Sequence, residues 1–203
     1  MCIRDRNLGG FTQISGTVGA ATVTLSKSIG GGTLPAIAIS TDELCDPDEE
    51  EGCDEINGPI YSAAADFVAD LILQLAARGG ELMPEGLGLN INYPPLAPVE
   101  GAVVARQGQT GKFPGVPGSV SLTYGCYGDC VTVPPGIGIP AGITGISPVE
   151  ESVANADTTK NAEGFITIVP IRSDFTSGFA NETLGQDTAF RAKLKKMLRK
   201  MDF

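Results

Sequence analysis

A hydroxyl-rich turn, followed by a small-residue helix and then a buried strand, limits the fold of this chain more than any other feature. Residues 15–21, Ser-Gly-Thr-Val-Gly-Ala-Ala, open a run to about residue 28 in which small and apolar residues recur at helical spacing, with Ser15 or Thr17 as the cap. Residues 34–40 are nearly all apolar, which is typical of a strand covered on both faces. These segments predict half of a βαβ unit, whose first strand we expect before Asn7.

The turn at the head of this helix is also a candidate anion site. Ser15, Gly16 and Thr17 would present free backbone N–H groups and two hydroxyls at the positive end of a helix, an arrangement that suits a phosphate. A Ser or Thr before a helix also serves as a cap alone, so this plainer interpretation stays open.

The composition restricts both the fold and the partners. With 203 residues, 42% of them apolar, the chain can bury one ordinary core. Its 24 acidic and 14 basic residues give a net charge of −10, which argues against binding to a nucleic acid polymer. The sequence has no apolar run near the roughly 18–20 residues of a membrane-spanning helix, so we expect no transmembrane segment.

Histidine is absent from the sequence, which excludes several catalytic classes for this chain. Ser-His-Asp and Cys-His catalysis, histidine-ligated zinc and phosphatases with a histidine nucleophile all need an imidazole. Any hydrolysis would therefore depend on a carboxylate-bound metal or on residues outside this chain.

The cysteines indicate an exported protein. Cys45 and Cys53 bracket a short acidic loop, and Cys126 and Cys130 bracket Tyr-Gly-Asp in a turn-like region rich in Gly and Pro. Two such local pairs predict disulfides, and hence a periplasmic or secreted location. Free thiols or a four-thiolate zinc site are the alternatives, although neither spacing is the usual Cys-x2-Cys.

The first six residues differ from the rest of the chain. Residues 1–6, Met-Cys-Ile-Arg-Asp-Arg, show no periodicity and resemble the translated remnant of a sequencing adapter, so we expect a non-native scar. A genuine short N-terminal arm is the alternative. If these residues are a scar, Cys2 leaves the cysteine count, and the natural chain extends upstream with any signal peptide.

Two further regions carry distinctive composition. Residues 41–59 are expected to form an acidic loop, whose carboxylates suggest calcium although their spacing does not match an EF-hand. A solvated loop closed by a disulfide is the plainer interpretation. Residues 108–160 are rich in Gly and Pro, and their short apolar runs at 119–124 and 131–133 predict hairpin arms.

Hydrophobic periodicity predicts the remaining elements. We expect helices at residues 61–78 and 188–201, and strands at residues 86–93, 102–107 and 164–171. The second helix is amphipathic and lies in a C-terminal tail of residues 177–203, where docking on the core is the default and binding to a membrane surface the alternative.

Several segments, taken in order, resemble the SurE survival-protein nucleotidases. They are Asn7-x-Gly9 with residues 15–21, then residues 35–40, 65–67, 89–94 and 105–108, and finally Asp157 ahead of residues 164–171. The resemblance covers the chain from residue 7 to about residue 176, which we take as one SurE-like α/β domain. It implies a three-layer, Rossmann-like core with a mostly parallel sheet, truncated at its N-terminus, plus a β-hairpin extension that exchanges between subunits and a C-terminal helix.

The resemblance also implies a function. SurE proteins are phosphomonoesterases dependent on a divalent metal such as Mg or Mn, and they act as 5'/3'-nucleotidases on nucleoside monophosphates or as broader acid phosphatases on small phosphomonoesters. A homodimer or homotetramer is expected. A metal held by carboxylates would activate water and neutralise phosphoryl oxygens, while a helix N-terminus would hold the remaining charge.

This sequence departs from the family pattern where the metal should bind. The paired aspartates of the family's first strand, and its metal-binding serine, would lie upstream of this chain. The family's asparagine ligand aligns with Ile3, so Asn7 matches a second, non-ligand asparagine. We therefore expect no catalytic residue or metal ligand in this chain, and an inactive fragment. The residues that carry over, as the phosphate-side wall, are Asn7, Gly9, Ser15, Gly16 and Thr17.

Other polar residues have plainer interpretations, and other functions stay open. Asp157 and Asp174 flank a strand and are expected to be turn or cap residues, while Asn90 and Asn92 should satisfy backbone groups near a strand end beside the cleft. The alternative function is a secreted, noncatalytic module that binds calcium or another ligand through the acidic loop. A structural or oligomerisation domain built on the Gly/Pro-rich arms is a third.

Overall fold

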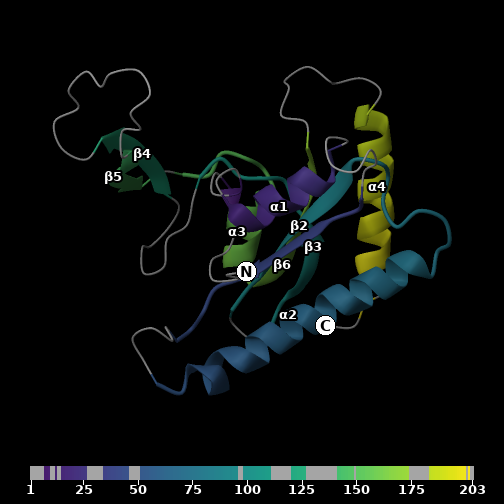
Figure 1. The fold of residues 1–203 in the computed structure, drawn as a ribbon, viewed down its shortest axis with the longest axis horizontal. Helices are drawn as coiled ribbons and strands as arrows, with labels where there is room; N and C mark the ends of the chain where they lie inside the picture. The colour runs from purple at the N-terminus through teal and green to yellow at the C-terminus, as the bar shows by residue number, and fades with distance from the viewer. Residues whose placement is uncertain are drawn as a thin grey trace.

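The computed structural model describes residues 7–9, 12, 15–26, 34–45, 51–95, 98–110, 120–126, 141–148, 150–173, 183–199 and 201. Within these described residues, four helices and six strands follow one another (Figure 1). Their bounds are α1 Gly16–Thr24, β1 Ile37–Thr41, α2 Cys53–Ala76, β2 Leu87–Tyr93, β3 Gly101–Val104, β4 Val120–Cys126, β5 Ala141–Pro148, α3 Asp157–Ala162, β6 Phe165–Arg172 and α4 Thr183–Leu198.

Four strands form an open sheet in the order β1-β2-β6-β3. Strands β1 and β2 are parallel, with Ile37 opposite Leu89, and β3 and β6 are also parallel, with Gly101 opposite Phe165. The central pair, β2 and β6, is antiparallel, with Ile91 opposite Ile168. The sheet is therefore mixed, and the fold is the predicted α/β class with an open sheet.

Helices cover both faces of this sheet, which makes the three predicted layers (Figure 1). On one face α1 packs against β1 and β6, and on the other α2 and α4 pack against β2, β3 and β6. The first face buries Val18, Ala21, Leu25, Ala38, Ala105, Val169 and Ile171; the second buries fourteen residues, with Leu71, Leu89, Ile91 and Ile168 fully enclosed. Side chains of β6 alternate between these two apolar layers. A shift of one residue would move each of them to the other layer, so the layers fix the strand register.

Helix α1 begins where the sequence predicts it. Ser15 is the N-cap, and its Oγ accepts a hydrogen bond from the N–H of Val18 at 3.2 Å. Helix α1 lies close to the sheet because β2 carries Gly88, where a Cβ would come within 2.7 Å of the carbonyl oxygen of Ala36 and 2.9 Å of Leu25.

Helix α2 begins eight residues before the predicted start, so the expected loop over residues 41–59 is wrong for its last seven residues. Gly52 is the N-cap in a left-handed conformation, and Asp54 and Glu55 lie in the first turn, where carboxylates favour the positive end of the helix. Pro59 lies inside the helix and lacks an N–H to donate, which is why the sequence pattern suggested a loop there.

The Gly/Pro-rich region contains a hairpin, as predicted. Strand β4, which matches the run predicted at 119–124, pairs antiparallel with β5, so that Val120 lies opposite Pro148. The run at residues 131–133 lies outside the described residues. Figure 1 places this hairpin away from the four-stranded sheet.

The C-terminal helix α4 docks on the core, as expected of an amphipathic helix. It begins five residues before the predicted start and buries Phe190, Leu194, Met197 and Leu198 against the sheet. Of the described helices, α2 has the length and apolar content of a membrane span, but the core helix of a soluble protein passes the same test. The expectation of no transmembrane segment therefore stays a prediction.

Candidate functional site

The turn of residues 7–9, called here the 7–9 turn, is anchored to the sheet through Asn7. The N–H of Asn7 donates to Asn92 Oδ1 at 2.5 Å, and its side-chain amide donates to Ser40 Oγ. Its carbonyl oxygen accepts from Nδ2 of Asn90 at 2.8 Å and of Asn92 at 3.1 Å. Asn7 is thus a buried anchor. The prediction that the two strand asparagines satisfy backbone groups is confirmed.

Gly9 ends this turn in a conformation that suits glycine. Its φ is +54°, and a Cβ there would lie 1.8 Å from the carbonyl oxygen of Thr110 and 2.8 Å from Cγ2 of Thr158. Its N–H donates to both carboxylate oxygens of Asp157, at 3.1 and 3.2 Å, and its carbonyl accepts from Nε2 of Gln107 at 3.1 Å. Any side chain at this position would displace the 108–110 segment.

Asp157 connects three segments of the chain. Its buried carboxylate accepts hydrogen bonds from the N–H groups of Gly9, Gly108 and Thr158, the last two at 2.8 Å. Burial raises the pKa of this carboxyl above its ordinary value of 3.8, although the three hydrogen bonds act in the opposite direction. Asp157 is the first residue of α3, whose N-cap is Ala156 without a side-chain cap bond, so the expected turn or cap role is wrong. The bonds to the two glycines were missed, because they join residues far apart in sequence.

A second carboxylate, that of Glu151, holds the segment after Gly108. Its Oε2 accepts from the N–H of Gln109 at 3.0 Å, from the N–H and hydroxyl of Thr110, and from the hydroxyl of Thr158. Burial alone would raise the pKa of Glu151, but the hydrogen bonds from Val153, Thr110 and Thr158 together lower it. No sequence pattern pointed to Glu151, because its partners lie far from it along the chain.

The predicted phosphate-side residues fall into two groups. Asn7 and Gly9 are buried in the 7–9 turn, whereas Ser15 and Thr17 are half-buried and Gly16 is exposed at the N-terminus of α1. The first N–H groups of a helix have no partner within it, and the N–H of Val18 already bonds to Ser15. The N–H groups of Gly16 and Thr17 therefore lie at the N-terminus of the helix without a partner inside it, whereas Asn7 and Gly9 are held by the sheet and by Asp157.

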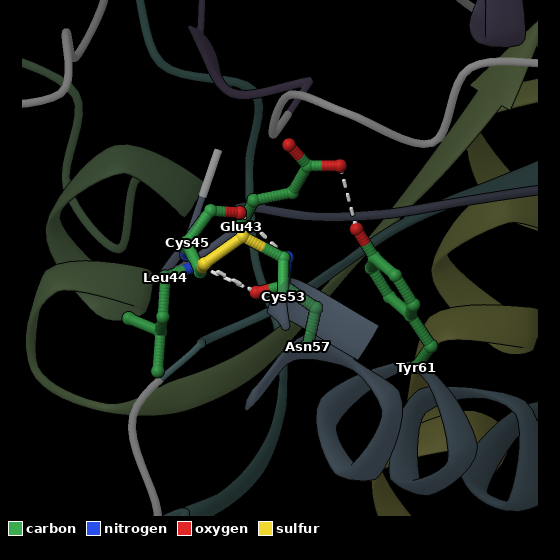
Figure 2. Close-up of a disulfide and its surroundings, with 6 residues drawn as sticks. All are labelled: Glu43, Leu44, Cys45, Cys53, Asn57 and Tyr61. Atoms are coloured by element: carbon green, nitrogen blue, oxygen red, sulfur yellow. Dashed lines mark hydrogen bonds between the residues drawn. A yellow bond between two sulfur atoms is a disulfide. The ribbon is translucent and has the colours of Figure 1, made fainter. Parts of the chain in front are cut away.

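One of the two predicted disulfides lies among the described residues. Cys45 and Cys53 are bonded, with their Cα atoms 5.3 Å apart (Figure 2). Asn57, on the first turns of α2, reinforces this link: its Oδ1 accepts from the N–H groups of Leu44 and Cys45, and its Nδ2 donates to the carbonyl of Cys45 at 2.6 Å. Figure 2 also shows Tyr61 donating to Glu43, at 2.7 Å.

The residues of the remaining cysteine and calcium predictions lie wholly or partly outside the described part of the chain. Cys2 and Cys130 lie outside the described residues, so the pairing of Cys126 with Cys130 is not described. The same holds for Asp174 and for the acidic residues 46–50 of the calcium alternative.

Comparisons with known proteins identify the family of this chain. A sequence model of the family "Survival protein SurE" matches residues 4–112. The chain belongs to the SurE family. The 5'-nucleotidase SurE of Symbiobacterium thermophilum is 38% identical over 108 residues, which cover 52% of this chain and 34% of that protein. The 5'-nucleotidase SurE of Jannaschia sp. is 32% identical over 181 residues, which cover 86% of this chain and 59% of that protein.

A solved structure has the same fold. The crystal structure of the SurE protein from Aquifex aeolicus matches with a TM-score of 0.52 and 22% identity, covering 90% of this chain and 62% of that one. This SurE-family chain thus spans about three fifths or less of the length of the relatives that it matches.

The described residues do not form a metal site of the kind this family implies. They contain no group of three or more His, Cys, Asp or Glu side chains that could hold a metal ion. Both oxygens of Asp157 already accept backbone N–H groups, and both oxygens of Glu151 are likewise engaged. Among the described residues, Asn90 Oδ1 and Thr167 Oγ1 are buried without a hydrogen-bond partner, but two neutral oxygens are too few for Mg²⁺.

Proposed function

We propose that this chain is the substrate-side part of a metal-dependent phosphomonoesterase that hydrolyses nucleoside monophosphates. The match of the SurE family model to residues 4–112 carries the proposal, together with two relatives named as 5'-nucleotidases. The geometry supports it, because a turn anchored at both ends precedes a capped helix N-terminus. Broader acid phosphatase activity on small phosphomonoesters belongs to the same proposal.

In this proposal, the phosphate lies against the exposed end of α1. The N–H groups of Gly16 and Thr17, with the hydroxyl of Thr17, donate hydrogen bonds to phosphoryl oxygens, and the helix dipole favours their negative charge. Asn7 and Gly9 act indirectly: they fix the path of the chain into the helix. Donors that are held in place before the substrate binds lose little free energy to reorganisation.

The metal in this proposal, Mg or Mn, is bound by residues outside the described part of the chain. The carboxylates of Asp157 and Glu151 are committed to loop contacts, so we propose that the ligands belong to the paired aspartates that the family resemblance implies. Such a metal supplies a Lewis acid and a metal-activated water. The chain as given is then an inactive fragment of a larger enzyme.

The cellular context is also a proposal. The disulfide between Cys45 and Cys53 supports a periplasmic or secreted enzyme, since such bonds persist in oxidising compartments. The separate β4–β5 hairpin supports assembly into a homodimer or homotetramer through exchanged arms.

The test uses the gene with its upstream coding sequence restored. We expect the longer protein to release phosphate from AMP with Mg²⁺ or Mn²⁺, and the chain of residues 1–203 to release none. Gly16→Pro removes one N–H at the first helical position, where proline is well tolerated, and Thr17→Val removes the hydroxyl. Each should lower kcat/KM at least about tenfold, because each removes a donor to the transferred phosphoryl group.

Thr24→Val is the matched control for these variants. Its hydroxyl only donates to the carbonyl of Ala21, at 2.8 Å within the same helix, so activity should stay within about twofold of the parent. An upstream sequence without paired aspartates, or a longer protein with no metal-dependent phosphatase activity, would refute the proposed function.

A further inference from the structure

One edge of β3 lines a groove of about 500 Å³. Among the described strands, β3 lies at one end of the four-stranded sheet, so β6 pairs with only one of its two edges. Residues 100–104 line the groove in an unbroken run, and the C-terminal part of α4 forms a second wall. The rest of the lining comes from Asn155, Lys160 and Phe165. We call this space the β3 groove.

The backbone of β3 directs hydrogen-bonding groups into this groove. Alternate residues of a strand face opposite neighbours. The N–H of Ala105 donates to the carbonyl of Ile168 at 3.0 Å, in register with the parallel pairing of β3 and β6. The N–H and C=O groups of Ala102 and Val104 therefore point away from β6. Such groups on an edge strand are a template for pairing with a further strand.

The next outward-facing residue of this edge, Arg106, already has a partner of this kind. Its N–H donates to the carbonyl of Asn155 at 3.0 Å, and its carbonyl accepts from the N–H of Asp157 at 2.8 Å, which makes a single parallel bridge. Before Asn155 the chain turns away, because Glu151 is bonded to the 109–110 segment. Within the described part of the chain, this outer pairing is limited to Arg106, and the β3 groove continues the same edge.

Two cations lie beside this edge. Lys195 and Arg199 line the groove from α4, and both are exposed. Neither side chain forms an ion pair or a hydrogen bond with the residues that the structure describes. Lys160 is already paired with Glu163, and the lining includes one acidic residue, Glu100. The groove thus offers two available positive charges in a chain whose net charge is −10.

We propose that the β3 groove binds an extended acidic peptide of another protein, which adds a strand to the sheet. Main-chain hydrogen bonds to Ala102 and Val104 supply affinity, and Lys195 and Arg199 select carboxylate side chains. The run of residues 100–104 spans about 16 Å, the length of about five residues of an opposing strand. This inference does not rest on the proposed function.

The first test measures binding of synthetic peptides to the chain of residues 1–203 by isothermal titration calorimetry. The glutamate probe is a peptide of about seven alternating valines and glutamates with blocked ends, so that a strand carries all its carboxylates on one face. The charge control has lysine in place of glutamate. We expect saturable binding of the glutamate probe and at least about tenfold weaker binding of the control.

Two modified probes test the main-chain pairing. In one, the backbone nitrogens of the glutamates are methylated, and in the other those of the valines. Each change removes the N–H donors of alternate residues, and one of these two sets faces β3 in a paired strand. At least one modified probe should therefore bind at least about tenfold more weakly, because its hydrogen bonds to β3 are lost.

A pair of double variants tests the choice of side chain. Lys195→Gln/Arg199→Gln should weaken binding of the glutamate probe at least about fivefold. Lys193→Gln/Lys196→Gln is the matched control, since it removes the same charge from exposed positions of the same helix outside the β3 groove. It should change the affinity less than about twofold.

Amide hydrogen exchange followed by NMR locates the bound peptide. A saturating amount of the glutamate probe should slow exchange of the N–H groups of Ala102 and Val104 at least about tenfold. Exchange in β1, at the other end of the described sheet, should not change.

Four results would overturn the proposal. The first is no binding of the glutamate probe by the folded chain. The second is full binding of both methylated probes, which would show that side chains alone suffice. The third is equal weakening by the control double variant, which would indicate unspecific attraction of negative charge. The fourth is slower exchange in β1 and not at Ala102 or Val104. None of these uses phosphatase activity, so failure here is separable from failure of the proposed function.

Discussion

At the scale of single residues, a few polar groups determine the shape of the 7–9 turn. Asn7 and Gly9 make hydrogen bonds to residues 85 and 148 positions away in sequence. The sequence indicates Asn7 and Gly9 as site residues, but it does not indicate these distant partners. Their importance comes from burial, since a buried N–H or C=O that loses its partner destabilises the fold by about 1–3 kcal/mol.

Gly9→Ala should destabilise the protein strongly. The left-handed conformation is unfavourable for alanine by about 1–2 kcal/mol, and the overlap with the carbonyl of Thr110 adds about 1–3 kcal/mol. The free energy of unfolding from urea titrations would measure this. Gly19→Ala is the control, since it meets open space inside α1 and should stabilise the helix by up to about 1 kcal/mol. Similar stability of the two variants would contradict the described geometry.

Asp157 and Glu151 should affect stability with opposite pH dependence. The pKa of Asp157 is raised on folding, so the stability from its protonation is complete below 3.8 and is lost as pH rises through the folded pKa. The pKa of Glu151 is lowered, so its contribution is present above 4.5 and is lost as pH falls through the folded pKa.

Unfolding measured from pH 3 to pH 7 on Asp157→Asn and Glu151→Gln tests this pair. Relative to wild type, Asp157→Asn should gain stability as pH rises, because the amide stays neutral. Glu151→Gln should lose stability relative to wild type over the same rise. If both variants gained stability relative to wild type as pH rises, or both lost it, the pKa values of the two carboxyls would not be shifted in opposite directions.

At the scale of elements, α2 depends on a covalent link at its first residue. The Cys45–Cys53 disulfide and the hydrogen bonds of Asn57 hold the chain before α2 against its first two turns. Pro59, which lacks an N–H donor, lies in the second turn of the same helix.

Cys45→Ser/Cys53→Ser should lower stability by about 2–3 kcal/mol, because the link closes a short loop in the unfolded chain. Thermal unfolding with and without reductant measures this. Reductant should lower the melting temperature of the wild type by breaking this bond. The double variant lacks the bond, so reductant should not have this effect on it. An equal melting temperature for oxidised wild type and double variant would argue against the bond.

The elements that could be predicted from sequence are those with a local pattern. Helix α1 with its Ser15 cap, the strands β2 and β6, and the amphipathic α4 all follow from spacing along the chain. The start of α2 could not be predicted, because Gly58 and Pro59 are typical of loops and tertiary contacts outweigh them. Strand β5 lacks alternation, and only its pairing with β4 defines it.

At the scale of the whole molecule, the candidate site could be predicted only in part. The family resemblance indicated Ser15, Gly16 and Thr17, and the structure places them at the exposed end of α1. It gave no indication of the hydrogen bonds that Asp157 and Glu151 accept from the 108–110 segment. Such groups are assembled by topology: β6, which pairs with both β2 and β3, brings late segments next to early ones.

The bond between Gly9 and Asp157, 148 positions apart, has a consequence for synthesis in the cell. A ribosome releases the start of this chain long before it makes the carboxylate that the first turn requires. Until then Asn7 can bond to Asn90 and Asn92, but the N–H of Gly9 has no carboxylate to bond. A nascent chain interrupted before Asp157 would therefore leave this turn anchored on one side alone and more open to proteases and chaperones.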